Sequence, residues 1–314
     1  MRIRIITPAP PRSRKGNRIS ALRWAGLLRE LGHRVWIQQG YEGECADVVI
    51  VMHALKSAVA AAEFRTSCKA FKLVLLLTGT DVYGDIHTSP VARDALAAAD
   101  RLVVLQPLAL DQLPARHRRR AHVIVQSATA PRAAVPRARG CQVCVVGHLR
   151  DVKDPMLAAK ASRLLPGESK IRVVHAGSIL EAKYERLTRA ENTANPRYRY
   201  AGELPRGRVM RLLAASRALV LSSCSEGGAN VISEAAVCGT PVLATRIDGN
   251  VGLLGADYPG YFECGDAAAL AALMLRLEHD LAFEHDLQRR MRALAPQFKP
   301  AREKQALRKL LASL

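Results

Sequence analysis

Short apolar segments alternate with longer amphipathic ones along this chain, and the alternation occurs twice. The short segments are rich in Val, Ile and Leu, whereas segments such as Arg18–Leu31 and Ser57–Arg65 have the spacing of amphipathic helices. Strands that are apolar throughout and separated by helices are typical of a parallel sheet covered on both faces. The strands predicted in the first half are Arg2–Thr7, Arg34–Gln38, Asp47–His53, Lys72–Thr78, Arg101–Leu105 and His122–Gln126.

The segment Ala128–Gly140 interrupts this pattern, because Pro, Ala and Arg dominate it and no strand period survives. The pattern then restarts, with strands predicted at Gln142–Val146, Ile171–His175, Tyr198–Ala201, Ala218–Ser222 and Pro241–Thr245, and helices at Asp154–Leu165, Leu180–Ala194, Arg206–Ala215 and Asn230–Cys238. We therefore predict an α/β fold with two Rossmann-like parallel-sheet domains that face a cleft. The first covers residues 1–130 and the second residues 140–296. The final helix, residues 297–314, is expected to cross back onto the first domain.

The formal net charge of +19 favours nucleic acids or phosphorylated small molecules as partners. Aromatic residues make up only 4% of the chain, and it lacks zinc-finger spacing and an RNP-like motif, so nucleic acid is not the expected partner. No apolar run is long enough to span a membrane, and the N-terminus lacks the apolar stretch of a signal peptide. We expect a cytoplasmic protein without stable membrane insertion.

Seven cysteines are present, and we interpret them as free thiols in a reducing compartment. Cys141 and Cys144 have the CxxC spacing of a zinc site, but no second pair follows. Their alternation with valine favours a strand, so we predict no metal site there.

The stretch Ser225–Thr245, SEGGANVISEAAVCGTPVLAT, combines a glycine pair with a predicted helix start. Glycines permit close approach of the backbone, and Gly239 suits the left-handed end of a helix. The start of a helix carries partial positive charge and free N–H groups, which suit a phosphate or diphosphate. The expected donor contacts are Gly227, Gly228, Ala229, Asn230 and Val231.

Two glutamates bracket the glycine pair. Glu234 would lie about one turn into the helix, where it could accept hydrogen bonds from a ribose diol, and Glu226 would lie nearer a reacting sugar. Two solvated glutamates on a strand–turn–helix are the alternative. We favour the site because the glycines, the helix start and CGTPVLAT fall in register.

Three further loops follow predicted strands. Arg150 and Lys153 lie in VGHLRDVKDP, where cations could neutralise a diphosphate leaving group. Lys15, Gly16 and Asn17 lie in TPAPPRSRKGNR and could approach phosphates across the cleft, with Gly16 and Asn17 expected to contact the donor. This loop lacks both the GxGxxG and the P-loop pattern. Thr80 and Asp81 lie in LTGTDVYGD and could point into the cleft. Ordinary surface loops are the alternative in each case. No DxD motif is present, so we expect neither a metal nor another cofactor.

Together these motifs resemble the GT-B glycosyltransferases of family 4. The motif that carries the resemblance is Glu226-x7-Glu234 followed by EAAVCGTPVLAT, and the VGHL…Lys153 loop, the TGTD loop and the final helix agree with it. The resemblance covers nearly the whole chain. It implies a UDP-sugar donor held by the second domain, with Glu234 at the ribose, Glu226 beside the donor sugar and Lys153 at the diphosphate.

A closer resemblance is to the selenosugar synthases of selenoneine biosynthesis, through TPAPPRSRKGNRISALRWAGLLRELGHRV, LTGTDVYGD, VLQPLAL, GHLRDVKDP and SEGGANVISEA. It implies transfer of a sugar from UDP-N-acetylglucosamine to selenophosphate. The side chains expected at the acceptor are Arg12, Lys15, Arg18, Thr80 and Asp81. The wider family usually has arginine after the loop glycine Gly147, where this chain has His148, and Arg150 is a candidate to replace it.

The sequence is compatible with three alternatives. The first is a hexosyltransferase with a hydroxyl acceptor, and the second is a nucleotide-sugar epimerase on the same fold. The third is a basic nucleic-acid-binding protein. The sequence gives no indication of the oligomeric state.

Overall fold

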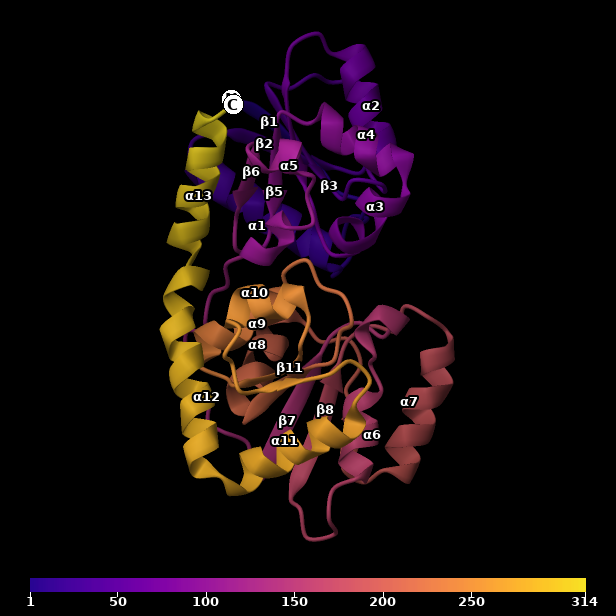
Figure 1. Cartoon of the computed structure of the whole chain (residues 1–314), viewed down its shortest axis with the longest axis vertical. Helices are drawn as coiled ribbons and strands as arrows, with labels where there is room; N and C mark the ends of the chain where they lie inside the picture. The colour runs from indigo at the N-terminus through magenta and orange to yellow at the C-terminus, as the bar shows by residue number, and fades with distance from the viewer. The chain divides into compact units, whose positions relative to one another are not determined.

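The computed structural model describes residues 1–314, and the chain divides into two compact units. The first unit comprises Met1–Ser127, Glu226–Gly228 and Pro300–Leu314, and the second comprises Ala128–Ser225 and Ala229–Lys299. Each unit is built on one six-stranded parallel sheet (Figure 1). The predicted α/β class with two Rossmann-like sheets is confirmed.

The sheet of the first unit has the strand order β2-β1-β3-β4-β5-β6. Its order reverses between β1 and β3, and the loops at the carboxyl ends of these strands flank that switch point. The strands are β1 (Arg2–Ile6), β2 (Arg34–Gln38), β3 (Val48–Met52), β4 (Lys72–Leu76), β5 (Arg101–Val104) and β6 (Ala121–Val123), and the helices between them are α1 (Gly16–Glu30), α2 (Ala58–Ser67), α3 (Ile86–Thr88), α4 (Pro90–Ala98) and α5 (Ala115–Arg118).

Two apolar clusters cover the two faces of this sheet. On one face, Trp24 of α1 packs in a cluster with Leu307 of the C-terminal helix, and on the other Phe64 of α2 packs with Leu96 of α4. Because both faces are covered, a central strand such as β3 is buried at every position.

The C-terminal helix α13 (Pro300–Ala312) belongs to the first unit, as predicted. Its Glu303 is 1% exposed and accepts hydrogen bonds from Arg23 Nε at 2.9 Å, from Trp24 Nε1 at 2.8 Å and from the backbone N–H of Ser127 at 2.9 Å. A buried carboxylate with several donors fixes the helix in one register.

The sheet of the second unit has the order β12-β11-β10-β7-β8-β9, which reverses between β7 and β10. The strands are β7 (Cys141–Val146), β8 (Ile171–Ala176), β9 (Tyr198–Tyr200), β10 (Ala218–Leu221), β11 (Val242–Thr245) and β12 (Tyr261–Phe262), and the helices are α6 (Leu157–Arg163), α7 (Lys183–Ala194), α8 (Arg206–Ala215), α9 (Asn230–Cys238), α10 (Asp248–Leu254), α11 (Ala267–His279) and α12 (Leu281–Leu294). Cys141 and Cys144 lie in β7 as buried strand residues, as predicted. None of the helices in either unit combines the length and apolar composition needed to cross a membrane.

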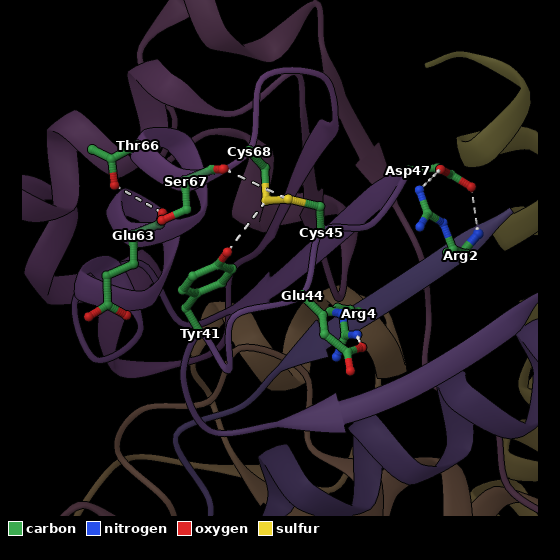
Figure 2. The surroundings of a disulfide bond; sticks show 10 residues. All are labelled: Arg2, Arg4, Tyr41, Glu44, Cys45, Asp47, Glu63, Thr66, Ser67 and Cys68. Atoms are coloured by element: carbon green, nitrogen blue, oxygen red, sulfur yellow. Dashed lines mark hydrogen bonds and ion pairs between the residues drawn. A yellow bond between two sulfur atoms is a disulfide. The ribbon is translucent and has the colours of Figure 1, made fainter.

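The prediction of free thiols is wrong for two of the seven cysteines. Cys45 and Cys68 form a disulfide that ties the segment before β3 to the end of α2, as Figure 2 shows. The two residues are 23 positions apart, and neither belongs to a short motif. Their pairing depends on the tertiary fold, which the cysteine count alone does not specify.

Candidate active site

The strand order of the second unit defines where a ligand is expected. Strands β7 and β10 are neighbours in the sheet, but their connections run to opposite sides of it. In open α/β sheets, ligands bind outside the carboxyl ends of the strands at such a switch point. The two segments there are the loop Gly147–Asp154 after β7 and the turn from β10 into α9.

The α9 helix begins at Asn230 and ends at Cys238, the bounds predicted from the sequence. Gly239 ends it with φ of 67°, in the left-handed conformation that favours glycine. No side chain caps its start, and Ala229 at the cap position has no hydroxyl or carboxylate to offer. The first N–H groups of a helix have no partner within it, so this end is suited to an anion.

Glu234 lies on α9 and is 9% exposed. Its Oε1 accepts a hydrogen bond from Arg206 Nη1 at 2.9 Å, at the start of α8. Arg206 was not among the predicted site residues. Its only sequence signal is its place in LPRGR at a helix start, which is common to surface helices.

The loop after β7 is anchored through its backbone. Ser222 Oγ, just after β10, donates to the carbonyls of Lys153 and Asp154, both at 2.9 Å. The N–H of Cys224 donates to the carbonyl of Val152 at 2.9 Å. These bonds fix the basic loop against the segment that leads into α9.

Two basic side chains of this loop were predicted to face a diphosphate. Arg150 is half-buried, and its guanidinium makes no side-chain hydrogen bond or ion pair. Lys153 is half-buried as well. His148 occupies the position of the family arginine, and its Nδ1 accepts the N–H of Ser178 at 3.1 Å. That bond fixes the His148 ring to the neighbouring loop.

His175 of β8 forms a hydrogen bond with the first residue of this loop, Gly147. It is fully buried, with Nε2 3.2 Å from the carbonyl oxygen of Gly147 and Nδ1 3.0 Å from the hydroxyl of Tyr198. Burial lowers the pKa of His175 to about 4. The neutral ring therefore donates from Nε2 to Gly147 and accepts from Tyr198. From the sequence, His175 was predicted only as the end of a strand.

The segment Glu226–Gly228 packs within the first unit. Close packing explains why two of its residues are glycines. A Cβ on Gly227 would lie 2.0 Å from the carbonyl oxygen of Thr78, and one on Gly228 would lie 2.6 Å from Cβ of Leu105. The carbonyl of Gly228 also accepts from Gln126 Nε2 at 2.8 Å. Neither position has room for a side chain, and Glu226 beside them is 9% exposed.

In the first unit, the TGTD loop is tied to the end of β3. Asp81 is fully buried, and its oxygens accept from the N–H of Ala54 at 2.9 Å and from the N–H and hydroxyl of Thr78, both at 2.8 Å. His53 Nε2 lies 3.0 Å from Thr80 Oγ1. We expected Asp81 to point into a cleft, but its burial and three bonds make it a support of the turn that carries Thr80.

His53 has φ of 78°, which is strained for a residue with a side chain. Its Nδ1 accepts the N–H of Lys56 at 3.3 Å, so Nε2 carries the proton that is donated to Thr80. Burial lowers the pKa of His53, although the carboxylate of Asp81 opposes the shift. The ring is therefore neutral near pH 7.

The loop after β1 reaches α1, which begins at Gly16 with Asn17 next to it. Arg12, with φ of 66°, and Lys15 are exposed. Arg18 is half-buried on α1, and its Nε is buried without a hydrogen-bond partner. The three basic side chains predicted to bind the acceptor substrate thus differ in their burial.

A family model described as glycosyl transferases group 1 matches residues 132–297, which is more than half of the chain. The chain belongs to this family. It is a glycosyltransferase, which argues against the nucleic-acid-binding alternative. No curated protein matches it.

Solved structures show the same fold over the full length of the glycosyltransferase. It is similar to Alr3699/HepE of Anabaena in complex with UDP and glucose, with 17% identity, a TM-score of 0.80 and 100% of both chains covered. Sucrose-phosphate synthase from Thermosynechococcus elongatus has 17% identity, a TM-score of 0.79 and the same coverage. A glycosyltransferase from Rickettsia africae has 15% identity and a TM-score of 0.72, with 99% of this chain and 98% of that chain covered. The fold is GT-B.

Proposed function

We propose that this glycosyltransferase transfers the N-acetylglucosamine or glucose unit of a UDP-sugar to selenophosphate, forming a carbon–selenium bond and releasing UDP. The part of this proposal that concerns the UDP-sugar donor rests on one observation at the switch point of the second unit. There the basic loop after β7 is bonded to the segment that leads into the uncapped start of α9. Complexes of the structurally similar Anabaena protein with UDP and with UDP-glucose support it.

In this proposal the diphosphate lies at the start of α9, where the N–H groups from Gly228 to Val231 meet its oxygens. Arg150 and Lys153 neutralise the charge that develops on UDP as its bond to the sugar breaks. Glu234 accepts hydrogen bonds from the ribose, and Glu226 orients the donor sugar. Gly147 and His148 would contact the donor from the loop that His175 supports.

The selenophosphate half rests on the resemblance of several stretches to selenosugar synthases. A selenium lone pair forms the bond to the anomeric carbon, while the bond from that carbon to the diphosphate oxygen breaks and its electrons leave with UDP. Such an acceptor is already ionised, so no general base has to remove a proton. This agrees with the first unit, where both His53 and Asp81 are buried and bonded to neighbours.

The test is to incubate the enzyme with UDP-N-acetylglucosamine and selenophosphate and to search by mass spectrometry for the selenium isotope pattern in a sugar product. Reactions that lack either substrate, or that contain phosphate in place of selenophosphate, are the controls. We expect UDP release and the selenium-bearing product to appear together. UDP release that selenophosphate does not accelerate, with no selenium in any sugar, would overturn the proposal.

A hydroxyl acceptor is the nearest alternative for the same site. If a sugar or polyol accelerated UDP release and selenophosphate did not, the donor half of the proposal would stand and the acceptor would be a hydroxyl. An isomerised donor without any coupled product would indicate an epimerase.

A further inference from the structure

A cavity of about 450 Å³ lies in the first unit, where β1 and β2 meet α1. Most of its lining is charged or polar, and it includes Arg4, Arg18, Arg29, Trp36, Gln38, Glu42 and Glu44. Only Arg18 among them was expected to contact a ligand. The predicted donor residues of the second unit do not line this cavity.

Arg4 is an unusual residue for the middle of a sheet. Its side chain is 5% exposed, and its one carboxylate partner, Glu44, is 72% exposed at the rim. Figure 2 shows the two side chains together near the disulfide. The guanidinium also lies over the Trp36 ring, 5.1 Å from its centroid. Arg4 Nε is buried without a hydrogen-bond partner, and such a group costs free energy unless something bonds to it.

Two more polar atoms in this lining are buried without partners. One is the donor Nε of Arg18, and the other is the acceptor Oε1 of Gln38, a residue that is 6% exposed. Gln38 is already oriented, because its Nε2 donates to Glu42 Oε2 at 2.7 Å. The cavity therefore presents two unmatched donors on arginines and one unmatched acceptor on an amide.

These unmatched atoms define the chemistry of an occupant. The guanidinium group of arginine binds phosphate oxygens well, so the unmatched Nε donors of Arg4 and Arg18 favour a phosphate group. The amide oxygen of Gln38 and the carboxylate of Glu42 call for donors such as hydroxyl groups. Trp36 is 41% exposed and offers an apolar face, as ligand sites usually do beside a few polar groups. A ligand with all three properties is a phosphorylated sugar.

We propose that this cavity is a binding site for a sugar phosphate. Arg4 and Arg18 bind the phosphate, and Gln38 and Glu42 accept hydrogen bonds from hydroxyl groups. Arg29 adds a third positive charge to the lining while its Nη2 donates to the carbonyl of Val35 at 2.5 Å. The disulfide at Cys45 holds the segment that carries Glu42 and Glu44.

The test uses glucose 6-phosphate as the probe, added to the full-length protein without UDP-sugar or selenophosphate. Binding is measured by calorimetry and by intrinsic fluorescence. The chain has two tryptophans, and Trp24 is fully buried, so Trp36 should report occupancy. We expect saturable binding that weakens about tenfold or more in Arg18→Gln and in Gln38→Leu, because each removes a bond to the ligand. Arg34→Gln, on the same strand as Trp36 but outside the lining, is the matched control and should bind as the wild type does.

Trp36→Phe separates binding from its signal, since it should lose the fluorescence change and keep the calorimetric heat. The proposal is overturned if glucose 6-phosphate shows no saturable binding at millimolar concentration, as expected if water alone fills the cavity. Equal affinity in both cavity variants and the wild type would overturn it as well, as would inorganic phosphate binding as tightly as the sugar phosphate. If UDP displaced glucose 6-phosphate, the cavity would not be separate from the donor site. None of these outcomes depends on the transfer reaction.

Discussion

Polar side chains at the strand ends are used in opposite ways in the two units. In the first unit, Asp81 and His53 are buried, and the polar atoms of both side chains form hydrogen bonds with neighbours in the same unit. In the second unit, the loop after β7 is held by backbone carbonyls and amides, and the guanidinium of Arg150 makes no bond within the protein. In this loop the guanidinium of Arg150 is left for a ligand, whereas the side chains of His148 and Asp151 bond to neighbouring residues. The first cluster is therefore expected to govern stability, and the second to govern turnover.

The largest effect on stability should come from Asp81→Ala. The change removes the acceptor of the buried N–H of Ala54 and of the part-buried N–H of Thr78. We expect the free energy of unfolding to fall by about 3 kcal/mol or more, measured by urea denaturation. Asp94→Ala removes a carboxylate from an exposed position on α4 and is the matched control. Equal stability of the two variants would mean that Asp81 is not the support of this turn.

A buried histidine of the second unit should make stability depend on pH. The pKa of His175 is about 4 in the folded chain, below the ordinary value of 6.5, because the ring is desolvated. The unfolded state therefore binds more protons between these values, and stability is lost as the pH falls from about 6.5 to 4. The loss should reach about 3 kcal/mol. Denaturation of His175→Gln should show a flatter pH profile, whereas the exposed His285→Gln should follow the wild type.

Turnover should respond most to the basic loop. Lys153→Ala and Arg150→Ala each remove a charge from the proposed diphosphate site, and we expect turnover with UDP-N-acetylglucosamine and selenophosphate to fall by ~100-fold or more. The free energy of unfolding should stay within about 0.5 kcal/mol of the wild type. Arg172→Ala, exposed on β8, is the control. If both loop variants turned over almost normally, these cations would have no part in the departure of UDP.

A substitution in the glycine pair tests whether steric packing or donor binding explains why both positions are glycine. Gly227→Ala places a methyl group where the carbonyl oxygen of Thr78 lies 2.0 Å away, so the backbone must shift. Overpacking of this kind should lower the free energy of unfolding by about 2 kcal/mol. Gly207→Ala, with nothing within 4 Å of the added carbon, is the control and should be neutral or slightly stabilising. Equal results for the two variants would refute the steric explanation.

The sequence predicted the elements well wherever a local signal sets them. The bounds of α9 follow from the glycine pair before it and Gly239 after it, and the apolar run of β3 follows from burial on both faces. The final helix could be assigned because its amphipathic pattern comes after the second βα array. By contrast, β12 has two residues, too few for a period to be recognised.

Parts of the site that depend on tertiary contacts could not be predicted in this way. The disulfide joins cysteines 23 residues apart, and the hydrogen bond between His175 and Gly147 joins β8 to the loop after β7. Asp81 looked like a ligand-facing carboxylate, because sequence shows which loop a residue is in but not whether its oxygens are already bonded. The cavity around Arg4 left no motif, since its residues come from two strands, a helix and the segment between β2 and β3.

The smallest expected effect concerns Arg206, which contacts Glu234 at 2.9 Å and has a side chain that is 47% exposed. An ion pair with one exposed partner contributes at most about 1 kcal/mol, so Arg206→Gln should weaken UDP binding less than about fivefold. Glu234→Ala should weaken it more, because it removes the proposed ribose acceptor itself. Arg208→Gln on the exposed side of α8 is the control, with calorimetry of UDP binding as the readout. If Arg206→Gln weakened UDP binding as much as Glu234→Ala, Arg206 would itself contact the nucleotide and would do more than pair with Glu234.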